Sequence, residues 1–189
     1  MPAPRLSICV YCGARPGRDP AYAMAAAETG RALAGAGWRL VYGAGDIGLM
    51  GEVARAAQAS GGDTLGVIPQ HLVGREMARR DLGRLIVTET MHERKKVMFM
   101  NADAALILPG GAGTLDEFFE VLTWAQLGLH AKPLVLLNVA GYWDPLLGLL
   151  RHVVAEELAP EATLSTVTAV SEPGAAIGAL RHALQPSSE

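Results

Sequence analysis

Residues 104–117 read AALILPGGAGTLDE, an apolar run that leads through a glycine-rich turn into a segment of helical composition. The apolar run is typical of a buried strand, and the helix is expected to open at Thr114. The glycines at positions 110, 111 and 113 leave no side chain between the backbone and a ligand. Because N–H groups at a helix N-terminus attract anions, the segment predicts a phosphate cradle with a carboxylate, Glu117, at its edge.

The same alternation of apolar runs and helical patterns continues along the chain. The expected strands are 6–11, 39–42, 64–68, 85–88, 104–108, 134–138 and 167–170, and the expected helices are 21–36, 49–60, 92–101, 115–127, 145–158 and 172–184. Strands without polar alternation that are joined by helices form a parallel sheet with both faces covered. The sequence therefore predicts one α/β domain, residues 1–189, with a doubly wound, Rossmann-like sheet of about seven strands. The polar segment 69–83 is expected to be a loop at the carboxyl end of a strand, where such folds keep their sites.

Composition excludes several classes of function. The chain has 189 residues, of which 50% are hydrophobic and 19% charged, enough for one sizeable core. A formal net charge of −3 offers no broad basic surface for nucleic acid or an anionic membrane. No apolar run reaches the roughly 18 to 20 residues of a membrane span, and the N-terminus shows no signal-type pattern. We therefore expect a cytoplasmic protein that binds neither nucleic acid nor membrane.

Two cysteines, Cys9 and Cys12, have the CxxC spacing of redox pairs. A thioredoxin-like pair opens a helix, whereas Cys9 lies inside an apolar run, and residues three apart on a strand face opposite sides. Two cysteines without a second pair also make a poor zinc site, and the His, Cys and carboxylate residues show no other ligand spacing. We expect both cysteines to be structural, and neither a metal nor another cofactor.

A second glycine-rich stretch, residues 43–48, reads GAGDIG and matches the GxGxxG dinucleotide pattern. It follows the second expected strand, whereas the dinucleotide fingerprint follows the first, and Asp46 would put a negative charge beside a pyrophosphate. The acid about twenty residues on, Asp63, precedes a strand instead of ending one. We interpret the stretch as a tight turn or as support beside a mononucleotide.

Residues 90–96, TMHERKK, combine a helix start with three consecutive cations. Thr90 and Glu93 fit a capping box, so the cations at 94–96 fall near the positive end of the helix dipole, where positive charge is unfavourable. A site that holds an anion would explain the arrangement. The alternative is that these side chains simply reach solvent.

Glu117 also allows two interpretations. Thr114 and Glu117 repeat the T-x-x-E spacing, so Glu117 could do nothing more than close a capping box on its helix. A carboxylate beside a phosphate cradle is equally placed to face the sugar of a bound nucleotide.

Together, these motifs resemble a known family. The stretch 109–117, with MHERK at 91–95, is similar to the paired signature of the Lonely Guy (LOG) family, the cytokinin-activating phosphoribohydrolases. The likeness runs from ICVYCG at 8–13 to LNVAGYW at 137–143, and the loop 43–51 is similar to the family's second glycine loop. The resemblance implies hydrolysis of the N-glycosidic bond of an AMP-like nucleotide, such as a cytokinin riboside monophosphate. The products would be the free base, cytokinin or adenine, and ribose 5-phosphate.

The resemblance also implies roles for individual residues and the assembly that is typical of the family. Arg94 and Glu117 are expected to be the catalytic pair, and Glu76 a further ligand contact. The other expected substrate-binding residues are Lys95, Gly110, Gly111, Ala112, Gly113, Thr114, Gly43, Gly45 and Met50. The family is typically dimeric with sites near the subunit interface, so a homodimer is expected here.

Three positions depart from the family pattern. Ala14 stands where a serine is usual, and Ala44 and Asp46 replace a glycine and a small polar residue. The lost hydroxyl and the added carboxylate are expected to weaken or redirect the phosphate contact. Members are often labelled lysine decarboxylases, but no lysine here lies in a context typical of a pyridoxal phosphate Schiff base. A nucleotide or cofactor carrier, a dinucleotide oxidoreductase and a purely structural protein stay open as alternatives.

Overall fold

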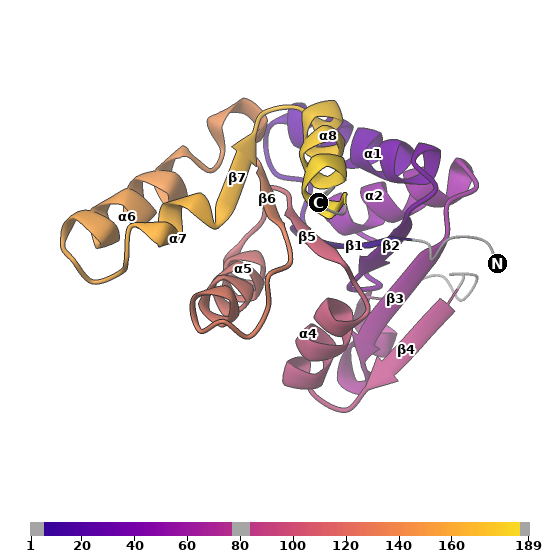
Figure 1. Cartoon of the computed structure of the whole chain (residues 1–189). Coiled ribbons are helices and arrows are strands. Elements are labelled where there is room, and N and C mark those ends of the chain that lie inside the picture. The colour runs from indigo at the N-terminus through magenta and orange to yellow at the C-terminus, as the bar shows by residue number, and fades with distance from the viewer. Residues whose placement is uncertain (1–5, 77–83, 186–189) are drawn as a thin grey trace.

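The computed structural model describes residues 6–76 and 84–185, apart from the side chains of Arg75 and Glu76. Its strands are β1 (Ser7–Tyr11), β2 (Arg39–Tyr42), β3 (Thr64–Pro69), β4 (Arg84–Thr88), β5 (Ala104–Ile107), β6 (Leu134–Leu137) and β7 (Val167–Val170). They form one sheet in the order β4-β3-β2-β1-β5-β6-β7, and every neighbouring pair is parallel (Figure 1). The predicted doubly wound α/β fold is confirmed.

Helices cover both faces of this sheet (Figure 1). Helices α1 (Pro20–Gly35), α2 (Gly48–Ala59) and α8 (Pro173–Leu184) pack on one face, and α4 (Met91–Met100), α5 (Ala112–Gln126) and α6 (Asp144–Ala155) pack on the other. Successive strand residues alternate between the two cores, since Ile8 and Val10 join the first and Cys9 and Tyr11 the second. The central strands β1, β5 and β6 are buried on both faces, and they read as continuous apolar runs.

Some boundaries differ from the sequence prediction. Helix α5 begins at Ala112, two residues before the expected start at Thr114. The segment expected as a loop at 69–83 contains a 3₁₀ turn, Gln70–Leu72, and the short helix α3 (Val73–Glu76) in its described part. Another 3₁₀ turn, Val139–Gly141, and the short helix α7 (Ala162–Ser165) were also not predicted. Single turns are too short to show a periodic apolar pattern, so they leave little signal in a sequence.

The order of the strands determines where a ligand can bind. The chain leaves β1 toward β2 on one side, whereas β5, on the other side of β1, leads to β6. Connections that diverge in this way leave a crevice beyond the carboxyl ends of the two strands. The glycine-rich turn that follows β5 therefore lies at the switch point of the sheet, and the GxGxxG stretch after β2 lies one strand away.

Lys132 holds the far end of α4 in place. Its ammonium group donates to the carbonyl oxygens of Phe99 and Ala102, both at 2.7 Å, and lies 4.2 Å from the centre of the Phe99 ring. Burial lowers the pKa of Lys132, but a cation at a helix C-terminus also interacts favourably with the helix dipole. The contact fixes the helix that carries Arg94.

Among the described residues, no helix combines the length and the apolarity that crossing a membrane requires.

The crossing of α1 and α2 leaves no room for a side chain at Gly30. A Cβ there would collide with the Val53 carbonyl oxygen and lie 2.9 Å from the Ala57 nitrogen. Gly30→Ala should therefore lower the free energy of unfolding by about 1–3 kcal/mol, although alanine is the better helix former. Urea denaturation measures this change.

Gly35→Ala on the same helix is the matched control, because a Cβ there meets no atom within 4 Å. It should leave stability unchanged or raise it by up to about 1 kcal/mol. Equal effects of the two substitutions would show that helix propensity, and not the close crossing, decides the outcome.

Candidate active site

A cavity of about 480 Å³ opens at the carboxyl ends of β1 and β5. Its walls come from the loop after β1, the glycine-rich turn, the N-terminal two turns of α2, α4 and α5, the 3₁₀ turn after β3, and two tyrosines. The lining residues are Cys12, Gly13, Ala14, Arg15, Pro16, Gly17, Tyr22, Leu49, Met50, Leu72, Met91, Arg94, Lys95, Pro109, Gly110, Gly111, Gly113, Thr114, Asp116, Glu117 and Tyr142. The crevice expected at the switch point of the sheet is therefore present as a cavity.

Hydrogen bonds join the loops that surround this cavity. The Gly13 amide donates to the Pro109 carbonyl at 3.0 Å, and the Met50 amide donates to the Gly13 carbonyl at 3.3 Å. From the segment after β6, the Tyr142 hydroxyl donates to the Gly110 carbonyl at 2.6 Å. Backbone from four separate parts of the chain is thus held in fixed relative positions around the cavity.

The N-terminus of α5 points amide groups at the site. Gly111 is the N-cap, and the first intrahelical bond runs from the Leu115 amide to the Gly111 carbonyl at 3.0 Å. An α-helix leaves its first N–H groups without intrahelical partners, and here these belong to residues 111–114. Gly110 is required by packing, because a Cβ there would collide with the buried Thr114 side chain. The arrangement is suited to a phosphate group.

Glu117 does not close a capping box. Thr114 is the third residue of α5 and not its N-cap, and no side chain caps this helix. Glu117 instead lies in the second turn, in the cavity wall, only partly exposed. Burial raises its pKa to about 7; Arg94 and Lys95 act in the opposite direction, and Asp116 and Glu120 add to the rise. A carboxyl group that ionises near neutral pH can both accept and release a proton.

Arg94 is buried, contrary to the interpretation that the cations of α4 reach solvent. Its Nη2 donates to the Gly43 carbonyl at 2.7 Å, and its Nε donates to the Val67 carbonyl at 3.2 Å. The sulfur atoms of Met50 and Met91 lie 4.0 and 3.9 Å from the guanidinium nitrogens. The side chain is therefore held at the cavity wall by a carbonyl just after β2, a carbonyl within β3 and two soft, polarisable sulfur atoms.

Lys95 is also buried, but its charge is already paired. Its ammonium lies 2.9 Å from the Asp116 carboxylate and 3.1 Å from that of Glu120. Burial works against the charged form, yet the hydrogen bonds with these two carboxylates leave the pKa of Lys95 raised overall. The contact ties α4 to α5. Of the three consecutive cations, Lys96 is exposed, as the alternative interpretation expected.

The predicted site residues fall into three groups. The cavity brings together Arg94, Glu117, Lys95, Met50, Gly110, Gly111, Gly113 and Thr114. Gly43, Gly45 and Ala112 are not among its lining residues; Gly43 acts behind the wall, since a Cβ there would collide with the Arg94 guanidinium. The side chain of Glu76 lies outside the described residues.

Sequence reasoning missed part of the wall. Arg15, Tyr22 and Tyr142 line the cavity, and Cys12 does so as a buried thiol whose pKa is raised by burial. The position of Arg15 in the loop after the first strand could have indicated that it lines the cavity, because ligands in this class of fold bind beyond the carboxyl ends of the strands. The two tyrosines meet edge to face with their ring centres 5.2 Å apart, although they lie 120 positions apart in the chain. No local pattern predicts such a contact.

The chain has clear relatives among known proteins. Residues 50–180 match the model of a family described as "Possible lysine decarboxylase". A cytokinin riboside 5'-monophosphate phosphoribohydrolase from Rhodococcoides fascians is 47% identical over 181 residues, 95% of this chain and 91% of that protein. The rice enzyme LOG, which carries the same name, is 50% identical over 149 residues, 79% of this chain and 62% of its own. The chain belongs to the Lonely Guy family.

Solved structures show how widely the fold of this Lonely Guy protein is shared. The molybdenum cofactor binding protein of Rippkaea orientalis aligns with a TM-score of 0.73 at 22% identity, over 97% of this chain and 99% of its own. The molybdenum cofactor carrier protein of Chlamydomonas reinhardtii aligns with a TM-score of 0.72 at 22% identity, over 96% and 99%. At this level of identity the likeness shows the fold alone.

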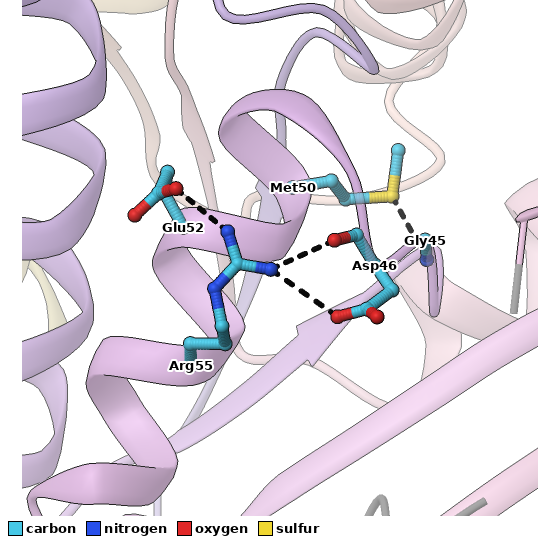
Figure 2. Close-up of polar contacts among 5 residues, drawn as sticks. All are labelled: Gly45, Asp46, Met50, Glu52 and Arg55. Atoms are coloured by element: carbon cyan, nitrogen blue, oxygen red, sulfur yellow. Dashed lines mark hydrogen bonds and ion pairs between the residues drawn. The ribbon is translucent and has the colours of Figure 1, made fainter. Parts of the chain in front are cut away.

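The departures from the Lonely Guy pattern have a local explanation in the second glycine loop. Asp46 does not line the cavity: its carboxylate lies 3.2 Å from Nη1 of Arg55, which also donates to the Asp46 carbonyl at 2.7 Å (Figure 2). Arg55 in turn pairs with Glu52 at 2.6 Å. The added carboxylate is therefore paired with a cation of α2 and lies outside the described lining of the cavity. Ala44 is fully buried with φ at +58°, a left-handed conformation that glycine adopts more easily.

The raised pKa of Glu117 makes stability depend on pH. The folded protein keeps the proton up to about pH 7, whereas the unfolded chain releases it near 4.5. Folding stability should therefore fall as pH rises through this window, with a slope of at most about 1.4 kcal/mol per pH unit. Glu117→Gln carries no such proton.

The measurement compares urea denaturation of wild type and Glu117→Gln from pH 4.5 to 8, since the other titrating groups are common to both proteins. The stability of the variant relative to wild type should increase from the acidic end and level off above about pH 7. A difference that does not change with pH would contradict the proposed environment of Glu117.

Proposed function

We propose that this protein hydrolyses the N-glycosidic bond of N6-modified adenosine 5'-monophosphates and releases the free base and ribose 5-phosphate. One observation carries the proposal: Glu117, with a pKa of about 7, shares a single cavity with Arg94 and the amide-bearing N-terminus of α5. Relatives that are 47% and 50% identical are named cytokinin riboside 5'-monophosphate phosphoribohydrolases, which supports the same class of substrate and reaction.

The bond determines what the site must do. When the bond between the ribose and the base nitrogen breaks, positive charge develops on the sugar and negative charge on the departing base. The Glu117 carboxylate stabilises the sugar cation, and it accepts a proton from the water whose oxygen bonds to the ribose carbon. The base leaves with the electron pair of the broken bond and takes up a proton.

Arg94 supplies the opposite charge. Because the Gly43 and Val67 carbonyls fix its guanidinium, it can offset negative charge in the transition state without reorganising at that moment. Lys95, paired with two carboxylates of α5, keeps the helix carrying Arg94 in position against the helix carrying Glu117.

Other parts of the cavity wall bind the 5'-phosphate and the base of the substrate. The amides of residues 111–114 bind the 5'-phosphate, and this binding energy orients the ribose against Glu117. The base would contact the apolar part of the lining, which includes Leu49, Met50, Leu72 and Met91. An apolar wall favours adenine with an apolar N6 substituent over adenine alone.

The direct test incubates the purified protein with AMP and, separately, with isopentenyladenosine 5'-monophosphate, and follows free base by chromatography. Wild type should release base, faster from the modified nucleotide, and Glu117→Gln should lower kcat/KM by about a hundredfold or more. Glu28→Gln, an exposed carboxylate on α1, is the control and should retain wild-type activity.

Two outcomes would contradict the proposal. Wild-type turnover by a folded Glu117→Gln variant would remove Glu117 from the mechanism. Tight binding of AMP by the wild type without release of base from either nucleotide would favour a carrier.

We also propose that the protein is a homodimer, as the family resemblance implies. Apolar side chains on α4, on α5 and just after α5 support this assembly, because they are exposed in the single chain: Met91, Met100, Phe119, Leu127 and Leu129. Clusters of exposed apolar side chains are typical of protein interfaces. A cytoplasmic location is proposed as well, and the two free cysteines fit a reducing compartment.

Light scattering coupled to size-exclusion chromatography tests the assembly. The wild type should elute with twice the mass of the 19.8 kDa chain. Leu127→Glu combined with Leu129→Glu should yield monomers, because both side chains are about two-thirds exposed in the single chain and would become buried charges in an interface. Leu158→Glu, at a site that is 81% exposed at the end of α6, is the control. A monomeric wild type would contradict the proposal.

A further inference from the structure

We infer that Arg15 is the cationic side chain that binds the 5'-phosphate of the substrate, together with the amides of α5. The inference rests on the proposed function for the identity of the substrate, but it concerns any phosphate monoester of a sugar that enters the cavity. It assigns a ligand-binding role to a loop whose usual serine is replaced by Ala14.

The positively charged side chains in the cavity wall differ in whether they already have partners. Among the residues that the structure describes, three cations line the cavity: Arg15, Arg94 and Lys95. Arg94 is buried against the carbonyls of Gly43 and Val67, and Lys95 is paired with two carboxylates. Arg15 is exposed, and within the described residues it forms neither a hydrogen bond nor an ion pair with another side chain. It is therefore the lining cation that is available to an incoming anion.

The backbone of Arg15 lies next to the glycine-rich turn. A Cβ placed on Gly13 would lie 3.3 Å from both the Arg15 carbonyl oxygen and the Gly110 Cα, so the Arg15 backbone adjoins the glycine-rich turn. On the other side, a Cβ on Gly48 would collide with the peptide group between Ala14 and Arg15. The Arg15 side chain thus starts from a closely packed loop next to the amides of α5.

A phosphate that enters the cavity meets carboxyl groups in its wall. Glu117 ionises near neutral pH and Asp116 also lines the cavity, so a phosphate dianion needs a compensating cation. The carboxylate of Asp46, which could have competed for Arg15, is held by Arg55 on α2 (Figure 2). A guanidinium is well suited to this role, because its planar fork can donate two parallel hydrogen bonds to phosphate oxygens.

The test measures phosphate recognition separately from turnover. Isothermal calorimetry with ribose 5-phosphate reports binding, and kinetics with AMP report KM and kcat. Arg15→Gln should weaken ribose 5-phosphate binding and raise KM by about tenfold or more, since hydrogen bonds to charged groups are the strong ones. The kcat should change by no more than about twofold. Arg15→Lys keeps the charge but loses the planar fork of the guanidinium. Its affinity for ribose 5-phosphate should lie between those of the wild type and Arg15→Gln.

Arg18→Gln is the matched control, because Arg18 is exposed on the same loop but does not line the cavity. It should bind ribose 5-phosphate like the wild type. Wild-type binding by Arg15→Gln, equal losses in both variants, or a wild type that binds neither ribose 5-phosphate nor AMP would each overturn the inference. A wild type that binds AMP through Arg15 but releases no base would sustain the inference while rejecting the proposed hydrolysis.

Discussion

The hydrogen bond from the Gly13 amide to the Pro109 carbonyl joins the two loops at which the order of the strands in the sheet reverses. It brings the end of β1 against the end of β5, and a Cβ on Gly13 would be in tight contact with the Gly110 Cα. The chain diverges on either side of this contact, so the space above it stays open as the cavity. The N-cap of α5, Gly111, lies two residues after Pro109, which is why the first amides of the helix face this space.

Burial of Arg94 accounts for the electrostatics of the site. A buried guanidinium is costly unless its donors are satisfied, and the Gly43 and Val67 carbonyls meet part of that demand. The same low-dielectric surroundings disfavour the ionised form of Glu117, and this effect exceeds the attraction of Arg94, so the pKa rises to about 7. The same buried environment thus fixes the position of Arg94 and raises the pKa of Glu117. Lys95 joins their two helices through its pairs with Asp116 and Glu120.

The sequence was sufficient for the sheet, because buried parallel strands such as β5 leave unbroken apolar runs. It also singled out Arg94 and Glu117, which belong to motifs with fixed spacing and line one cavity in the structure, while their catalytic roles stay a prediction. The sequence was insufficient where one pattern allows two structures. T-x-x-E is a capping box at Thr90 and Glu93. The same spacing at Thr114 and Glu117 is not a capping box, because that helix begins earlier, at Ala112. Contacts between distant segments, such as Tyr142 with Gly110, depend on tertiary packing that no local pattern encodes.

We propose that the switch point between β1 and β5, and not the GxGxxG loop, receives the nucleotide phosphate. A crystal structure of the Glu117→Gln variant with AMP tests this claim most directly, because the substitution should preserve the nucleotide while keeping the cavity intact. We expect the phosphate at the amides of residues 111–114 and the ribose beside position 117. A phosphate bound at residues 43–48, or a nucleotide outside the cavity, would contradict it.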